Sequence, residues 1–290
     1  MSQASILNRI RDIPSLPDVV NRIVDLMSHP NTPASEIARL ISYDPGLASK
    51  VLRMVNSSAY GFQRQISSIQ HGIMILGFNT VRGLVLSASI FQLFEGQKEL
   101  QGLNHVAFWE HCMATAIAAR VVAKQFRVPG TEDAFSAGML HDIGKIVLDV
   151  YFKSSYPEVL ASAKKHGITQ PHGPAFIQLE SSLMGTDHAL IGSHLANKWK
   201  LPVTITEAIQ FHHQPELAQS AKPLVYVVGL ANELARFKLA DPVQIFRQEY
   251  FTASIWDYFQ LDEDSCRGLL ELLSEELASI EEFQQSISSA

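Results

Sequence analysis

The chain has 290 residues, of which 47% are hydrophobic and 18% charged, a balance typical of a globular protein. This length fits one large domain or two ordinary domains. The formal net charge of −6 argues against a general binder of the nucleic-acid backbone, because such proteins are usually basic. Only Cys112 and Cys266 are present, so the sequence implies no disulfide framework and fits a reducing compartment.

The sequence also bears on localisation. The first residues, MSQASILNRIRDIP, lack the long apolar core of a signal peptide. No uninterrupted apolar stretch of about 18 residues occurs, so no membrane span is expected. We therefore expect a cytoplasmic protein whose partners include neither a membrane nor nucleic acid.

The first hundred residues read as a series of amphipathic helices. Residues 17–28 carry apolar side chains at helical spacing. Ser35 is placed to cap a helix over 35–42. Asp44 and Pro45 open the next helix, because proline costs no hydrogen bond at the first helical position. The remaining features expected in this half are a helix end near Asn56, a turn at Tyr60-Gly61, a short helix from Ser67 or Ser68 to Ile75 ended by Gly77, and a long apolar helix from Thr80 to Phe94.

A polar, glycine-containing stretch at 95–102 divides the chain into two expected parts, residues 1–100 and residues 101–290. The second part is also read as helical, with a loop over 167–174. Its expected helices are 105–126, 132–151, 156–166, 187–199, 203–213, 221–238 and 262–285. Few windows alternate with a period of two, so the predicted fold class is all-α.

The dipeptide His141-Asp142 lies inside one of these expected helices. Adjacent helical residues point about 100° apart, so both side chains can contact one ion, and the carboxylate can bridge to a second. Lys145 lies on the same helix face, where it could bind an anionic phosphate. Gly144 leaves room for close approach. The dipeptide alone is common, but the string HDIGK inside an apolar helix is much more specific.

Four further histidines complete a candidate ligand set. His111 lies in FWEHCMATA, His188 follows Asp187 at a helix start, and the pair His212-His213 ends a helix before Pro215. Each has an ordinary explanation when taken alone, as a packing residue, a residue beside an N-cap, or a favourable charge at a helix C-terminus. Together they supply imidazole and carboxylate, the ligands of transition metals.

These motifs resemble those of the HD superfamily of metal-dependent phosphohydrolases over residues 105–237. The resemblance implies metal ligation by His111, His141, Asp142, His188, His212 and His213, with catalytic roles for Asp142 and Lys145. Among the enzymes, the pattern is most similar to the HD-GYP branch, which hydrolyses cyclic diguanylate and uses two ions.

The first half resembles the HDOD domain, a regulatory relative of those enzymes. The resemblance rests on IPSLPDVVNRIVDLM, ISYDPGLASKVLRMVNSSAYG and ISSIQHGIMILGFNTVRGLVL, and it runs from about residue 7 to residue 240. It implies an N-terminal helical bundle packed on an HD-like bundle. Most members have lost the metal ligands and act as signalling or scaffolding modules, whereas this chain keeps most of them.

Two departures from the enzyme pattern matter. The final Asp of the motif falls in VYVVGLANELA, where this chain has Asn232, a neutral and weaker ligand. The glycine-tyrosine-proline signature of the HD-GYP enzymes is also missing.

Two functions follow as hypotheses. The first is a signalling module that contacts a protein partner and holds one or two divalent ions, of Fe, Mn, Zn or Ni. The second is a metal-dependent phosphohydrolase acting on a nucleotide or cyclic dinucleotide. The sequence does not decide whether Arg82 is a solvated charge or a contact for a partner.

Overall fold

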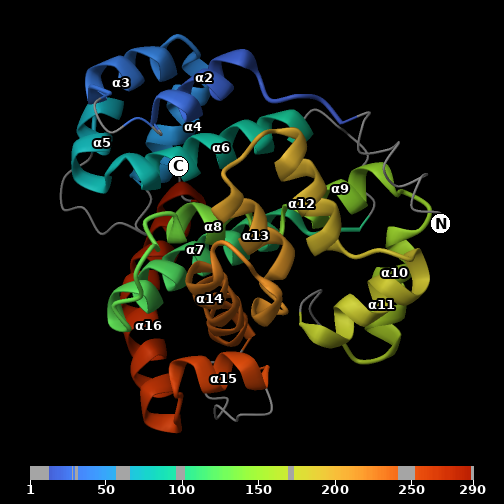
Figure 1. Ribbon diagram of the computed structural model, residues 1–290. Helices are drawn as coiled ribbons and strands as arrows, with labels where there is room; N and C mark the ends of the chain where they lie inside the picture. The colour runs from blue at the N-terminus through green and yellow to red at the C-terminus, as the bar shows by residue number, and fades with distance from the viewer. Residues whose placement is uncertain are drawn as a thin grey trace.

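The computed structural model describes residues 13–27, 29, 32–56, 66–95, 102–168, 173–240 and 252–288. Every regular element within these ranges is a helix and none is a strand, which confirms the all-α prediction. Figure 1 shows α2 to α5 gathered on one side of the molecule, with α6 running beside them toward the second half of the chain. The division into residues 1–100 and 101–290 stays a prediction, because most of the polar stretch at 95–102 lies outside the described residues.

The first half of the chain forms five described helices that pack on one another. Their bounds are α2 Asp18–Met27, α3 Ala34–Ser42, α4 Pro45–Val55, α5 Ile69–Leu76 and α6 Phe78–Glu95. Helix α6 contacts α2, α4 and α5, so it is the platform on which the smaller helices rest.

Local capping explains where these helices begin. The Asp44 side chain accepts a hydrogen bond from the Leu47 N–H at 3.0 Å, and Ser68 accepts one from the His71 N–H at 3.2 Å, as predicted. The prediction for Ser35 is wrong. Helix α3 begins at Ala34, Pro33 occupies the cap position, and no side chain caps this helix. The turn expected at Tyr60-Gly61 lies outside the described residues.

The second half contains the longest helices and the centre of the molecule. Its elements are α7 His105–Gln125, α8 Ala134–Leu140, α9 Ile143–Tyr151, α10 Tyr156–Lys165, α11 Pro174–Met184, α12 His188–Lys198, α13 Val203–Phe211, the 3-10 helix Pro215–Leu217, α14 Lys222–Ala240, α15 Ala253–Phe259 and α16 Glu263–Ser288. Helix α7 packs against α8, α14 and α16, and α12 packs against α9 and α13. Helices α10 and α11 pack on each other at the edge of the bundle (Figure 1).

Three expectations for this half are corrected, and one is that no helix was expected over the residues of α15. The single helix expected over 132–151 is two helices, α8 and α9, with a turn at His141 and Asp142. Helix α11 follows directly on the loop predicted over 167–174, and it was not expected. Its signals are nevertheless present, since Pro174 stands at the first helical position and Gly185 ends the helix in the left-handed region.

Two glycines allow helices to cross with their backbones in contact. A Cβ added at Gly144 would lie 1.9 Å from the carbonyl oxygen of His188, and one added at Gly138 would lie 2.7 Å from the Cα of Ala116. The first crossing confirms the close approach expected at Gly144. These contacts bring α9 onto α12 and α8 onto α7, which places the histidine-bearing segments together.

Helix α7 is also the one described helix that by length and composition could cross a membrane. Its segment Val106–Gln125 has a mean hydropathy of 1.2 over an 18-residue window, 56% of which is buried. Its neighbours on the buried side are α8 and α14, so the apolar composition of α7 serves the core of the bundle. The two cysteines, Cys112 and Cys266, are both free and buried.

Arg82 takes neither of the roles considered for it. Its side chain is 5% exposed and pairs with the carboxylate of Asp133, which stands at the cap position of α8. The other oxygen of Asp133 accepts a hydrogen bond from the Thr204 hydroxyl at 2.9 Å. A partly buried ion pair therefore joins α6 to the beginnings of α8 and α13.

Candidate metal centre

The predicted ligands come from widely separated parts of the chain and meet in the centre of the second half. His111 is on α7, His141 and Asp142 form the turn between α8 and α9, His188 begins α12, and His212 and His213 directly follow α13. All of these side chains are buried except His213, which is half-buried. The fold therefore brings together every histidine that the sequence singled out.

The helix break at His141 and Asp142 directs their side chains. Asp142 holds the cap position of α9, with φ −99° and ψ 9°, yet its carboxylate makes no capping hydrogen bond. Its backbone carbonyl instead accepts from the Lys145 N–H at 2.9 Å. The carboxylate is thereby left to face the histidines.

Two groups of side chains have the spacing of metal ligands. One contains His111, His141 and Asp142, and the other contains Asp142 with His188, His212 and His213. Within each group the potential ligand atoms all lie within 4.8 Å of one another. Asp142 belongs to both groups, as a bridging carboxylate would.

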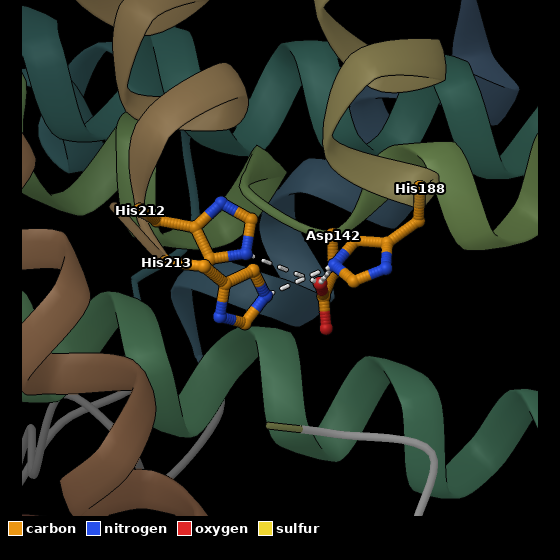
Figure 2. A group of neighbouring side chains, drawn as sticks. All are labelled: Asp142, His188, His212 and His213. Atoms are coloured by element: carbon orange, nitrogen blue, oxygen red, sulfur yellow. Dashed lines mark hydrogen bonds and ion pairs between the residues drawn. The ribbon is translucent and has the colours of Figure 1, made fainter. Parts of the chain in front are cut away.

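The two oxygens of Asp142 face different histidines. Oδ1 lies 3.2 Å from His188 Nε2 and 3.7 Å from His212 Nε2. Oδ2 lies 3.3 Å from His141 Nε2 and 3.5 Å from His111 Nε2. Figure 2 shows the carboxylate between His188 on one side and His212 and His213 on the other. One carboxylate therefore serves two adjacent sets of imidazoles.

Hydrogen bonds from Nδ1 to backbone carbonyls orient two of the rings. Nδ1 of His141 lies 2.7 Å from the Gly138 carbonyl oxygen, and Nδ1 of His212 lies 2.8 Å from the Ile209 carbonyl oxygen. A carbonyl only accepts, so both Nδ1 atoms carry hydrogen, and both Nε2 atoms face Asp142. Histidines that bind metals are held by this kind of outer hydrogen bond.

His188 is held by a carboxylate instead of a carbonyl. Its Nδ1 lies 2.6 Å from Glu180 Oε2, and its Nε2 lies 3.1 Å from His213 Nε2. Two neutral lone pairs would repel at that separation, so a proton or a cation must lie between them. Two nitrogen ligands of one ion are themselves about 3 Å apart, given bonds of about 2.0–2.1 Å.

Burial and neighbouring charges separate the pKa values of these imidazoles. Burial lowers the pKa of His188, but Glu180 and Asp142 outweigh burial and raise that pKa to about 9. Burial and the adjacent imidazoles lower the pKa of His212 and that of His213 well below 6.5. His212 and His213 are therefore neutral at pH 7, as metal ligands must be.

Lys145 is drawn into the same cluster. Its side chain is 1% exposed, and its Nζ lies 2.5 Å from Asp142 Oδ2. The ammonium thus sits at the pocket, where the resemblance places an anion-binding lysine, and it pairs with the shared carboxylate.

Asn232 lies on α14, which packs along α7, the helix that carries His111. Asn232 is 3% exposed, and its amide oxygen is buried and accepts no hydrogen bond from the residues that the structure describes. A buried acceptor of this kind fits a cation, although an amide is a weaker ligand than the carboxylate of the enzyme pattern.

Glu180 is the site residue that the sequence analysis missed. It lies on α11 and is fully buried, and its Oε2 accepts hydrogen bonds from both the backbone N–H and the ring of His188. Helix α11 was not predicted, so its carboxylate had no place in the ligand pattern. The available signal was a glutamate among the apolar residues of FIQLESSLM, directly after a proline helix start.

Comparison with known proteins gives a family match and similar folds. The HDOD domain family matches residues 13–215. An uncharacterized protein of Treponema pallidum (strain Nichols) is 30% identical over 239 residues, which is 81% of this chain and 44% of the relative. The chain therefore spans less than half of that relative's length.

Two crystal structures share the fold. An HDOD domain protein with unknown function from Geobacter sulfurreducens has a TM-score of 0.76 and 26% identity, covering 97% of this chain and 99% of that one. A protein of Shewanella amazonensis SB2B, provisionally described as a phosphohydrolase, has a TM-score of 0.75 and 24% identity, covering 97% of both chains. At that identity the second likeness is one of fold alone.

Proposed function

The chain belongs to the HDOD domain family, and we propose that it is a cytoplasmic signalling module with an HD-type pocket for one or two divalent transition-metal ions. The module acts through contacts with a signalling protein partner, and the pocket serves a structural or sensory role. A nucleotide or cyclic dinucleotide is the small ligand that such a pocket would suit.

The position of Asp142 carries the metal part of this proposal. Its Oδ1 faces His188 and His212, while its Oδ2 faces His111 and His141. Imidazole with carboxylate suits Zn, Fe, Mn and Ni, which is why the ion is placed in that class. The candidate ligands of the two ions would be His111, His141, Asp142 and Asn232 for one, and Asp142, His188, His212 and His213 for the other.

The regulatory part rests on the family and on Asn232. When bound, such ions supply Lewis-acid activation of water and of a phosphoryl group. Asn232 removes one negative charge from the set that would hold the ion beside His111. We therefore expect ions that bind without supporting rapid turnover.

The first test is elemental mass spectrometry of protein purified without chelator and without added metal. We expect one or two equivalents of iron, manganese, zinc or nickel, and none in Asp142→Ala. Protein that contains no metal even after soaking would overturn the pocket. For the module, a metal-loaded chain should retain a protein partner from lysate and hydrolyse neither nucleotides nor cyclic dinucleotides.

A metal-dependent phosphohydrolase is the second candidate, favoured by Lys145 beside the shared carboxylate. Under this hypothesis Asp142→Ala abolishes hydrolysis of a phosphodiester, and Asn232→Asp raises it. Wild-type and Asn232→Asp proteins that are both loaded with metal and both inactive would eliminate the enzyme hypothesis.

A further inference from the structure

Glu180 stands at the corner between α11 and α12. Its Oε2 lies 3.1 Å from the backbone nitrogen of His188 and 2.6 Å from Nδ1 of the same residue. One carboxylate oxygen thus holds both the first residue of α12 and its imidazole. The whole carboxyl group is buried, and within the described part of the chain its Oε1 accepts no hydrogen bond.

We propose that Glu180 is a positioning residue of this pocket, one that fixes His188 with Nε2 directed at Asp142 and His213. The proposal rests on the proposed metal pocket and adds a residue outside the set that the family resemblance implies. Glu180 belongs to neither of the two ligand groups.

The arrangement at His188 differs from that at the other anchored rings. His141 and His212 donate to carbonyl oxygens three residues earlier in their own helices, so each orientation is set locally. His188 donates to a side chain eight residues earlier, on a different helix. Its orientation therefore depends on how α11 is placed against α12, and Glu180 is the group that transmits that placement.

Chemistry gives the direction of the effect. A carboxylate that accepts the Nδ1–H of a ligating histidine fixes its tautomer and increases the basicity of Nε2. Loss of such a partner typically lowers metal affinity about 10-fold to 100-fold. The effect should fall on the ion beside His188 and spare the ion beside His111 and His141.

The test compares Glu180→Leu, which fills the space without an acceptor, with Glu180→Gln, which keeps an acceptor without the charge. Glu158→Gln is the control, because Glu158 is an exposed carboxylate on the neighbouring α10. The probe is Co²⁺, titrated against a competing chelator, and its visible absorption reports the coordination of each bound ion. Folding is checked first by circular dichroism, and Glu180→Met replaces the leucine variant if that variant does not fold.

We expect wild-type protein and Glu158→Gln to bind two Co²⁺ ions with the same affinities. Glu180→Leu should bind one ion with unchanged affinity and spectrum, and the other about 10-fold to 100-fold more weakly. Glu180→Gln should lose clearly less.

Three results would overturn the role of Glu180. If Glu180→Leu binds both ions with wild-type affinity, Glu180 has no positioning role, although the pocket itself stands. The same conclusion follows if Glu180→Gln loses as much affinity as Glu180→Leu. Wild-type protein that binds no Co²⁺ would overturn the pocket itself, and the role of Glu180 with it.

Discussion

Arg82 of α6, which is buried, forms an ion pair with the partly buried Asp133, 51 residues later at the start of α8. Asp133 also accepts from Thr204 at the start of α13. Helices α8 and α13 run from this contact and end at His141 and at His212, respectively. The ion pair therefore joins the first half of the chain to two of the helices that carry the candidate ligands.

Arg82→Ala should destabilise the protein by about 3 kcal/mol, because it leaves the Asp133 carboxylate without its buried partner. Urea unfolding followed by circular dichroism measures the change. Arg267→Ala is the matched control, since the pair between Arg267 and Asp264 is 3.4 Å long and largely exposed. It should cost less than about 1 kcal/mol. Equal losses in the two variants would contradict the importance of burial at Arg82.

Glu207 holds the segment between His213 and α14. Its two carboxylate oxygens accept from the backbone N–H groups of Gln219, Ser220 and Ala221, at 2.8 to 3.3 Å. Glu207→Ala leaves these donors without that acceptor, so we expect a loss of about 2 kcal/mol in the free energy of unfolding. Glu132→Ala, at an exposed position, should change it by less than about 0.5 kcal/mol. If Glu207→Ala leaves the free energy of unfolding unchanged, solvent replaces the carboxylate as the acceptor for these N–H groups.

Gly144 is required by the crossing of α9 over α12. In Gly144→Ala the new methyl would overlap the His188 carbonyl oxygen, so the helices must separate and the candidate pocket must open. We expect strong destabilisation, on the order of 3 kcal/mol or more. Gly268→Ala is the control, because its Cβ would meet open space on α16, and it should stabilise by roughly 0.5–1 kcal/mol. Thermal unfolding distinguishes the two, and a stable Gly144→Ala protein would contradict the described crossing.

The metal-free protein should be most stable near pH 6.5. The pKa values of His212 and His213 are lowered by folding, so these groups bind protons only in the unfolded state and stability rises with pH up to about 6.5. The pKa of His188 is raised to about 9, so its contribution is fully present below 6.5 and is lost as pH rises through 9.

The contribution of Glu233 to stability, like that of His188, decreases as pH rises. Burial raises the pKa of Glu233 from 4.5 to about 7, so its contribution falls between these values. Below pH 6.5 the rising contributions of His212 and His213 to stability outweigh the falling contribution of Glu233. Above pH 6.5 the contributions of His188 and Glu233 both fall. Urea unfolding at intervals from pH 5 to pH 9 tests the expectation, and stability that increases steadily to pH 9 would contradict it.

Above pH 6.5 metal affinity should rise with pH, whereas the stability of the metal-free protein falls. A ligating histidine must be neutral, and the pKa of about 9 keeps His188 protonated in the metal-free protein at pH 7. Affinity for the ion beside His188 should therefore rise by up to tenfold per pH unit between 7 and 9. Competition titrations with Zn²⁺ at several pH values measure it, with His188→Ala as the control that removes the slope. An affinity that does not change over this range would contradict a proton held on His188.

The sequence by itself determined the helical class, the family resemblance, most helix limits and the list of histidines with Asp142. Caps at Asp44, Ser68 and Asp187 could be predicted because a side chain there bonds a backbone N–H only three residues away. The break at His141 and Asp142 could not, because an apolar stretch with no proline reads as one continuous helix.

Only the tertiary structure decided how these residues meet. Three contacts join different helices. Asp142 faces two sets of histidines, Glu180 anchors His188, and Arg82 is buried against Asp133. Such contacts depend on which helices cross and where, and close passages such as that at Gly144 fix those crossings. Periodicity and capping are local properties of the chain, whereas the geometry of this pocket is set by packing between distant segments.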